Sequence, residues 1–224
     1  LDGVTGVQTC ALPIFSDNTN MEETQNTEEK ILAAAEEVFM KAGYDGARMQ
    51  EIANKAEINK AMLHYYFRSK DKLFEKIFDG KVKHFFPEIS EELDKNQTFI
   101  RKVDFMIDAY ISLIIRFPYI PLFVLNTVNK DNGASFITKL PISLIKKISG
   151  EYMAALEKGE VRKVDPFQLV ISILSMCAFP FVARPIIMQA GNLTKADFNQ
   201  LMEERKAELK RYLRFILVEG ESRI

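Results

Sequence analysis

Apolar residues recur at helical spacing along nearly the whole chain after residue 26. In the first such segment the positions i, i+1, i+4, i+7, i+8 and i+11 are occupied by Ile31, Leu32, Ala35, Val38, Phe39 and Ala42. This spacing places one apolar stripe along an amphipathic helix. The alternation of apolar and polar residues that marks a half-buried strand is absent from the sequence, and so is a repeat of solenoid length. The pattern therefore predicts an all-α fold.

Local start and stop signals predict where the N-terminal helices begin and end. Asn26 with Glu29 three residues later matches a capping box for the first helix, and Gly43 is a stop signal for it. Asn59 is expected to cap the third helix and Ser69 the fourth, which runs toward a proline at position 87.

Asp165 followed by Pro166 predicts the start of an apolar helix in the second half of the chain, because aspartate is a good cap and proline suits the first helical position. Pro180 and Pro185 are expected to kink or end that helix. The expected helices cover residues 27–42, 49–56, 60–67, 70–87, 99–117, 118–128, 134–158, 167–183 and 194–218.

Composition narrows the possible functions. The chain has 224 residues, and 47% of them are hydrophobic, which suits a sizeable core and excludes global disorder. Two cysteines and two histidines are too few for a disulfide scaffold or an ordinary zinc site, so we expect no metal and no cofactor. Residues 48–84 carry nine basic and five acidic side chains, although the whole chain has a net charge of −1. This local excess suits a phosphate-facing surface, and it is equally compatible with an ordinary solvated helix surface.

The N-terminal segment and the longest apolar run bear on localisation. Residues 1–15 lack the basic region of a signal peptide, since the first lysine is Lys30, and they resemble a translated adapter or vector read-through. We expect native sequence to begin near Ser16 or at Met21 and treat residues 1–20 as a leader. The apolar run at 169–183 is shorter than the roughly 18–20 residues of a bilayer span. We therefore expect a cytoplasmic protein with no membrane partner.

The most informative stretch runs from Arg48 to Lys70 and reads RMQEIANKAEINKAMLHYYFRSK. It contains two short expected helices separated by three or four residues, and the second is aromatic and basic. This is a helix-turn-helix pattern, in which the second helix enters the major groove of DNA. Four apolar side chains are expected to lock the second helix to the first: Ile52, Ala53, Ile58 and Leu63.

Residues 30–78 resemble the N-terminal domain of the TetR family of bacterial transcriptional regulators, in its AcrR-like form. The resemblance rests on ILAAAEEVFMKAGYDGA, then EIANKA, then INKAMLHYYFRSKDKLF. It implies a three-helix DNA-binding domain at residues 21–78 and a larger helical domain for ligand binding and dimerisation at 79–224. The rest of the chain matches this family only in length and helical character.

The resemblance also implies which side chains contact DNA. Lys60, Ala61, Met62 and His64 would lie on the groove-facing side of the recognition helix, with Asn59 at its start. Tyr65 and Tyr66 would approach phosphates, and so would Lys70, helped by the dipole at its helix N-terminus. From the residues alone, Tyr66 is equally compatible with a core position, and His64 with an ordinary surface position.

Two positions depart from the family pattern. Arg48 stands where the second helix normally offers a threonine hydroxyl to the DNA backbone, and its charge can make the same phosphate contact at longer reach. Glu57 stands where the turn usually has glycine. If that position needs a positive φ, a residue other than glycine costs roughly 1 kcal/mol there.

The second domain is rich in phenylalanine and methionine, which suit the wall of a cavity for an apolar small molecule. The resemblance implies such an effector site, and the residues expected to form it are Met106, Tyr110, Phe117, Phe123, Asn126, Met176 and Phe179. Ordinary core packing is the alternative for most of them. The helices at 167–183 and 194–218 resemble the pair that forms a four-helix dimer interface in this family.

These observations predict a homodimeric repressor that binds a pseudo-palindromic DNA operator and is released by a small apolar effector. An enzyme is disfavoured, because the chain lacks G-x-S-x-G, P-loop and G-x-G-x-x-G motifs and both histidines lie in or next to the DNA-binding segment. The alternative is a helical protein-interaction module that has lost DNA binding, for which Arg48 and Glu57 are the hints.

Overall fold

The computed structural model describes residues 17–129, 136–138, 140 and 142–218, and the regular elements described there are α-helices. The helices are α1 (Asp17–Gly46), α2 (Met49–Lys55), α3 (Lys60–Tyr66), α4 (Lys70–Asp94), α5 (Phe99–Arg116), α6 (Ile120–Val128), α8 (Ile142–Glu157), α9 (Pro166–Val182), α10 (Arg184–Ala190) and α11 (Lys195–Leu217). The all-α prediction is confirmed for this part of the chain. Of the helix expected at 134–158, residues 134, 135, 139 and 141 lie outside the described residues.

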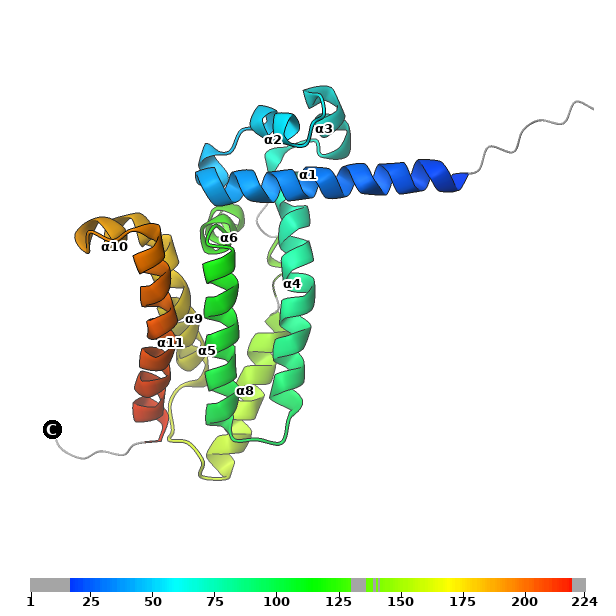
Figure 1. The fold of residues 1–224 in the computed structure, drawn as a ribbon. Helices are drawn as coiled ribbons and strands as arrows, with labels where there is room; N and C mark the ends of the chain where they lie inside the picture. The colour runs from blue at the N-terminus through cyan, green and yellow to red at the C-terminus, as the bar shows by residue number, and fades with distance from the viewer. Residues whose placement is uncertain (1–16, 130–135, 139, 141, 219–224) are drawn as a thin grey trace, which may run out of the picture.

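The helices form a small head on top of a larger bundle. In Figure 1, α1 runs across the top of the molecule with α2 and α3 on its outer side, and α4, α5, α8, α9 and α11 form the bundle below. The short helix α6 lies between α1 and the bundle, and α10 projects beside the upper end of α11. We call α1, α2, α3 and the first part of α4 the head.

Two clusters of buried side chains correspond to these two parts. The bundle cluster joins the second half of α4 to α5, α8, α9 and α11. The head cluster joins α1, α2, α3 and the start of α4, and it also contains Phe117, Tyr119, Ile120 and Phe123. The α5–α6 corner therefore completes the core of the head, although it belongs in sequence to the second domain.

Two expected features of the first helix have different outcomes. Helix α1 begins at Asp17, so Asn26 lies inside it and cannot be its cap; that prediction was wrong, because the helix extends over the residues before the capping signal. Gly43 interrupts the helix as expected, with φ of 70° and ψ of 178°. Glycine adopts this positive φ without the steric cost that a Cβ would bring.

Helix α4 links the head to the bundle. It continues through Pro87 to Asp94, further than the sequence indicated, and the expected boundary between residues 78 and 79 falls inside it. A single helix therefore starts in the head, where Ser69 accepts the N–H of Lys72, and ends at the far end of the bundle. The two parts share a rigid element and not a flexible linker.

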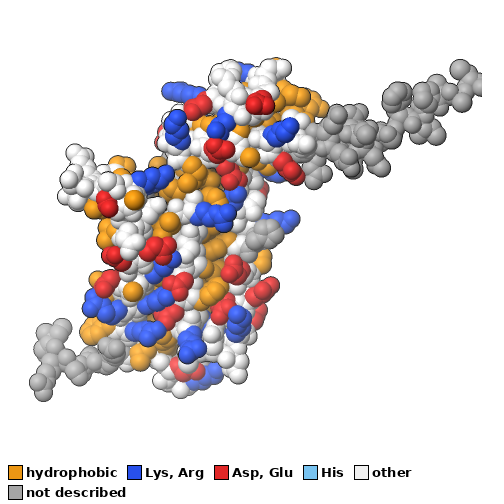
Figure 2. Space-filling model, in the orientation of Figure 1, with side chains coloured by type: hydrophobic (Ala, Val, Ile, Leu, Met, Phe, Trp, Pro, Cys, Tyr) orange, Lys and Arg blue, Asp and Glu red, His pale blue; other side chains and the backbone are white. Residues whose placement is uncertain are grey.

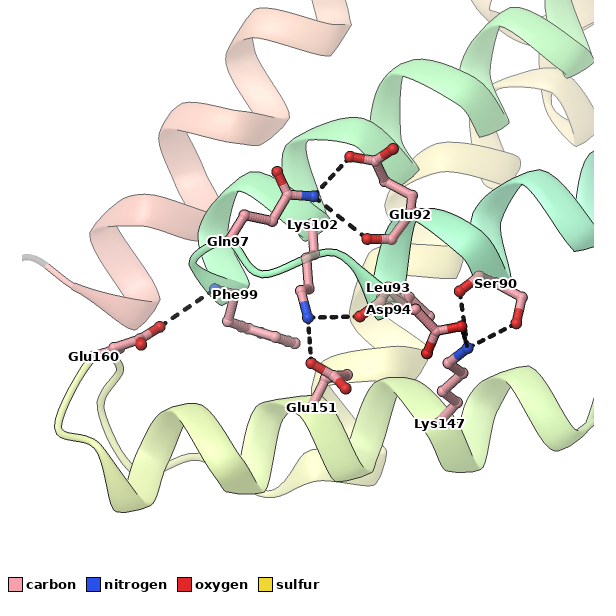
Figure 3. Close-up of polar contacts among 10 residues, drawn as sticks. All are labelled: Ser90, Glu92, Leu93, Asp94, Gln97, Phe99, Lys102, Lys147, Glu151 and Glu160. Atoms are coloured by element: carbon pink, nitrogen blue, oxygen red, sulfur yellow. Dashed lines mark hydrogen bonds and ion pairs between the residues drawn. The ribbon is translucent and has the colours of Figure 1, made fainter.

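The far end of α4 is held by lysines from two neighbouring helices (Figure 3). Lys102 of α5 is buried, donates to the carbonyl of Leu93 at 2.6 Å and pairs with Glu151 of α8. Lys147 of α8 donates to the carbonyl of Ser90 at 2.8 Å and pairs with Asp94 at 2.7 Å. The last carbonyls of a helix lack intrahelical partners and carry partial negative charge, so these ammonium groups satisfy them and fix this end of α4.

Two bends shape the upper end of the bundle. Among the described residues, no single helix is long and apolar enough to cross a bilayer; only the bent pairs α5–α6 (91°) and α9–α10 (67°) have the combined length and composition. Pro180 lies inside α9, which ends at Val182, and Pro185 is in the first turn of α10. Because Pro180 has no N–H for the carbonyl of Met176, that carbonyl accepts from the Arg205 Nε of α11 at 3.0 Å.

Candidate nucleic-acid interface and ligand cavity

The turn between α2 and α3 is closed by backbone hydrogen bonds. The Glu57 N–H donates to the carbonyl of Asn54 at 3.2 Å, and the Ile58 N–H donates to the carbonyl of Ala53 at 3.0 Å. This is a Schellman motif, which requires a left-handed residue after the helix, and Glu57 has a φ of 57°. The positive φ considered from the sequence is therefore present at this position.

Helix α3 starts immediately after this turn. The Asn59 side chain accepts the Met62 N–H at 2.7 Å, which confirms Asn59 as the cap. Leu63 and Phe67 are buried in the head cluster. Ile52 and Ala53 of α2 are also fully buried there, so α3 is held through one face only.

The opposite face of α3 is exposed. The side chains of Lys60, Ala61 and His64 are exposed, and Met62 and Tyr65 are 42% and 83% accessible. Tyr66 is half-buried and packs against the head cluster, with its ring 5.6 Å from that of Tyr65. The structure thus brings five of the residues predicted to contact DNA onto one free helix surface.

Arg48 is the residue before α2. It is exposed and extended, with φ of −113° and ψ of 135°, and its side chain makes no capping hydrogen bond. The position suits a cation that reaches toward a phosphate, because nothing in the head uses the side chain as a cap. Its contact with DNA stays a prediction.

Lys70 is placed differently from the expectation. Its Nζ donates to the carbonyls of Tyr44 at 2.7 Å and Ala47 at 3.2 Å, and it lies 4.5 Å from the centre of the Tyr44 ring. These carbonyls belong to the end of α1 and the segment after it, where partners are otherwise lacking. The ammonium group therefore joins the start of α4 to the end of α1, and we assign it this structural role in place of a phosphate contact.

A cavity of about 260 Å³ lies in the bundle below the head. Its wall comes from α4, α5, α6, α8 and α9, and the side chains that line it are Phe85, Phe86, Ile89, Met106, Tyr110, Val124, Leu140, Leu144, Ile145, Ile148, Val170, Ile173 and Leu174. No charged residue is among these lining residues. Such a wall suits an uncharged, largely apolar small molecule.

The Tyr110 hydroxyl is the polar group of this wall. Burial raises the pKa of Tyr110 to about 12, so the phenol is neutral at physiological pH. Burial likewise raises the pKa of the nearby Cys177 thiol to about 12, which leaves it protonated and unreactive. The cavity therefore offers one neutral hydrogen-bonding group in apolar surroundings.

The residues expected to bind a ligand are divided by the structure. Met106 and Tyr110 line the cavity. Phe117 and Phe123 instead belong to the buried head cluster, and Met176 packs against the bundle cluster. Asn126 is half-buried on α6 and Phe179 is 64% exposed on α9, and neither lines the cavity.

Sequence reasoning missed the part of the wall that α4 supplies. Phe85, Phe86 and Ile89 have the spacing i, i+1, i+4 of one helix face, which was visible in the sequence. They were overlooked because the helix was expected to run only toward Pro87, near its boundary with the next domain. A helix that continues through this proline places all three on the bundle side.

Comparison with known proteins identifies the family. The model of the bacterial regulatory proteins, tetR family, matches residues 31–77. IcaR of Staphylococcus aureus strain Newman, the negative transcriptional regulator of the biofilm operon icaADBC, is 31% identical over 156 residues, which cover 65% of this chain and 79% of IcaR. The chain belongs to the TetR family. It is accordingly a transcriptional regulator and not an enzyme.

Two further relatives of this TetR-family protein cover different parts of it. The transcriptional repressor NicS of Pseudomonas putida is 43% identical over 53 residues, 24% of this chain, and the match spans only 25% of NicS. The transcriptional regulator FadR of Bacillus subtilis, solved with stearoyl-CoA, has a TM-score of 0.61 at 16% identity and covers 86% of this chain and 99% of FadR. The sequence match is thus strongest in the head, and the structural match extends the fold over the bundle.

The strained turn leads to the first prediction. A Glu57→Gly variant should unfold with a free energy about 1 kcal/mol higher, because glycine adopts the φ of 57° without a Cβ clash. It should also bind DNA more tightly, because a carboxylate beside the recognition helix is removed. Denaturant unfolding and a DNA titration measure the two effects separately. Glu57→Gln is the control, since it removes the charge but retains the strain; unchanged or weaker DNA binding by Glu57→Gly would contradict the prediction.

Lys70 provides the second prediction. Lys70→Met should lower the free energy of unfolding by about 1–3 kcal/mol, because two backbone carbonyls lose their partner. Lys72→Met, at an exposed position on the same helix, should change it by less than about 0.5 kcal/mol. If Lys70 instead contacted a phosphate, the slope of log affinity against log salt would fall by about one in Lys70→Met. We expect this slope to stay unchanged.

Proposed function

We propose that this TetR-family regulator is a homodimeric repressor that binds a pseudo-palindromic operator and is released by a small, uncharged apolar effector. The observation that carries the proposal is the shared helix α4, which begins in the head beside α3 and lines the cavity with Phe85, Phe86 and Ile89. Occupation of the cavity and the position of the head are thereby linked through one rigid element. The printed names of IcaR and NicS as a negative regulator and a repressor agree with this mode.

The exposed face of α3 supports DNA binding. A recognition helix held on one side and free on the other is the geometry that a major groove accepts. Two such helices in a dimer read half-sites about one turn of DNA apart, roughly 34 Å. We place Arg48, Lys60 and His64 among the contacts with the operator.

Apolar side chains on the surface of α9 and α11 support the homodimer. On α9, Phe167 is 62% exposed and Ile171 and Leu174 follow it at helical spacing. On α11, Tyr212 and Phe215 are also exposed, the latter by 64%. Exposed apolar rows on adjacent helices expect a partner, and a second copy of the same pair supplies a self-complementary one.

The coupling between effector and DNA follows from the packing of α6. Val124 of α6 lines the cavity, and the adjacent Phe123 stacks on Phe74 in the head cluster with ring centres 3.8 Å apart. A ligand that displaces α6 or α4 therefore disturbs the core on which the head rests. Release requires the ligand to bind the two arrangements with different affinity, typically by 1–3 kcal/mol.

The test is a fluorescence-anisotropy titration of the full chain against its upstream intergenic DNA at two salt concentrations, with a scrambled duplex as control. We expect tight, salt-sensitive binding that prefers the native duplex. Equal weak binding to both duplexes, followed by failure to enrich any genomic fragment, would overturn the proposal and favour the interaction module. Uncharged apolar compounds that raise the melting temperature are then added to the complex, and release of DNA is the expected result.

A further inference from the structure

The outward face of α3 is unusual in its chemistry. The side chains opposite the buried Leu63 and Phe67 are Ala61 and Tyr65, flanked by Met62 on one side and His64 on the other. Between Lys60 and Arg68 the helix carries no arginine, lysine, asparagine or glutamine. Figure 2 shows hydrophobic side chains at the surface over α3.

Each base in the major groove is read by a particular type of side chain. Guanine is read by the paired donors of arginine or lysine, and adenine by the amide of asparagine or glutamine. Thymine presents a methyl group, which contacts apolar side chains such as alanine. On α3 the nearest amide is that of Asn59, and its oxygen already accepts the Met62 N–H at 2.7 Å.

The exposure of Met62 is meaningful because the head offers it space to be buried. Its neighbour Leu63 is fully buried, whereas Met62 leaves 42% of its surface accessible in the N-terminal half of the helix, where recognition helices meet base edges. Ala61 lies beside it and presents a methyl group to the same side. Together they form an apolar surface at the point of entry into the groove.

We propose that Met62, with Ala61 beside it, reads thymine methyl groups in the major groove, so that the operator half-site carries thymine where the start of α3 lies. The inference rests on the proposed function, since it requires α3 to enter DNA. It adds the type of base that is selected and the side chain that selects it. Lys60 and Arg68, at the two ends of this face, carry the charges that hold it against the phosphates.

The test first selects bound sequences from a pool of randomised duplexes with the full chain. Each thymine of the selected half-site is then replaced singly by deoxyuridine, which removes the 5-methyl group and leaves base pairing unchanged. We expect at least one replacement per half-site to weaken binding about fourfold, the value of one buried methyl group. The salt dependence should stay the same, because no phosphate contact is altered.

Protein variants assign the effect to a side chain. In Met62→Ala the penalty for deoxyuridine should disappear at one position, and the free energy of unfolding should change little because the side chain is exposed. Met153→Ala is the matched control, since Met153 is 44% exposed on α8 in the bundle, and it should retain the full penalty.

The outcomes separate this inference from the proposed function. Salt-sensitive, sequence-selective binding that tolerates deoxyuridine at every position overturns the thymine readout and leaves the regulator intact. A penalty that persists in Met62→Ala overturns the assignment to Met62. A pool that yields no selected sequence overturns the proposed function and the inference with it.

Discussion

A Phe215→Glu substitution is expected to convert the protein to a monomer and to weaken operator binding on the order of a hundredfold. Phe215 is 64% exposed on α11, so the isolated chain accommodates the carboxylate in water. In the proposed dimer the same position is covered by the second subunit, and an unpaired buried charge there is strongly unfavourable. Sedimentation measures the oligomeric state, and anisotropy with operator DNA measures the affinity.

The control for this substitution is Met153→Glu on α8. Met153 is 44% exposed but lies outside the helices proposed to form the interface, so this variant should remain dimeric and bind DNA normally. Far-UV circular dichroism shows whether both variants retain their helices. A folded Phe215→Glu protein that still sediments as a dimer would reject α11 as the interface.

A Phe123→Ala substitution is expected to lower the free energy of unfolding by about 3–5 kcal/mol, a large part of a typical total. Phe123 is fully buried, stacks on Phe74 with ring centres 3.8 Å apart and meets Phe136 edge-on at 5.5 Å. Truncation leaves a cavity among aromatic rings that come from three segments of the chain. Denaturant unfolding at one fixed protein concentration measures the loss, since dimerisation makes stability concentration-dependent.

Two companion variants keep this prediction testable. Leu125→Ala alters an exposed side chain on the same helix and should cost less than about 1 kcal/mol. Phe123→Leu fills most of the space, so it should remain folded even if Phe123→Ala does not, with a smaller loss. Equal losses for Phe123→Ala and Leu125→Ala would show that α6 does not support the head.

Much of the helix-turn-helix could be predicted because its signals are local. Asn59 caps α3 through the Met62 N–H three residues later, and Asp165 accepts the Gln168 N–H at the start of α9 in the same way. Both contacts lie within four residues of chain, where a capping side chain and the backbone amide are always neighbours. The positive φ of Glu57 was foreseen for the same reason, since a turn of this length needs a left-handed residue.

The cavity could not be predicted at the same level. Methionine and aromatic residues at helical spacing are the same in a core and in a cavity wall, and only the separation of the facing helices distinguishes them. Phe123 fills the head core while its neighbour Val124 lines the cavity. Lys70 shows the same limit for charge, because its three-residue path to DNA and its path to the carbonyl of Tyr44, 26 residues away, look alike in the sequence.

The sequence by itself determined the all-α class, the helix-turn-helix and the family, since periodicity, caps and a fifty-residue motif depend on contacts between near neighbours. The tertiary structure alone decided which aromatic residues are core, that α4 joins head to cavity, and that Lys70 binds the end of α1. These properties depend on contacts between residues far apart in the chain. Such contacts form because the helices bury their apolar faces together, and their partners are chosen by shape and not by spacing.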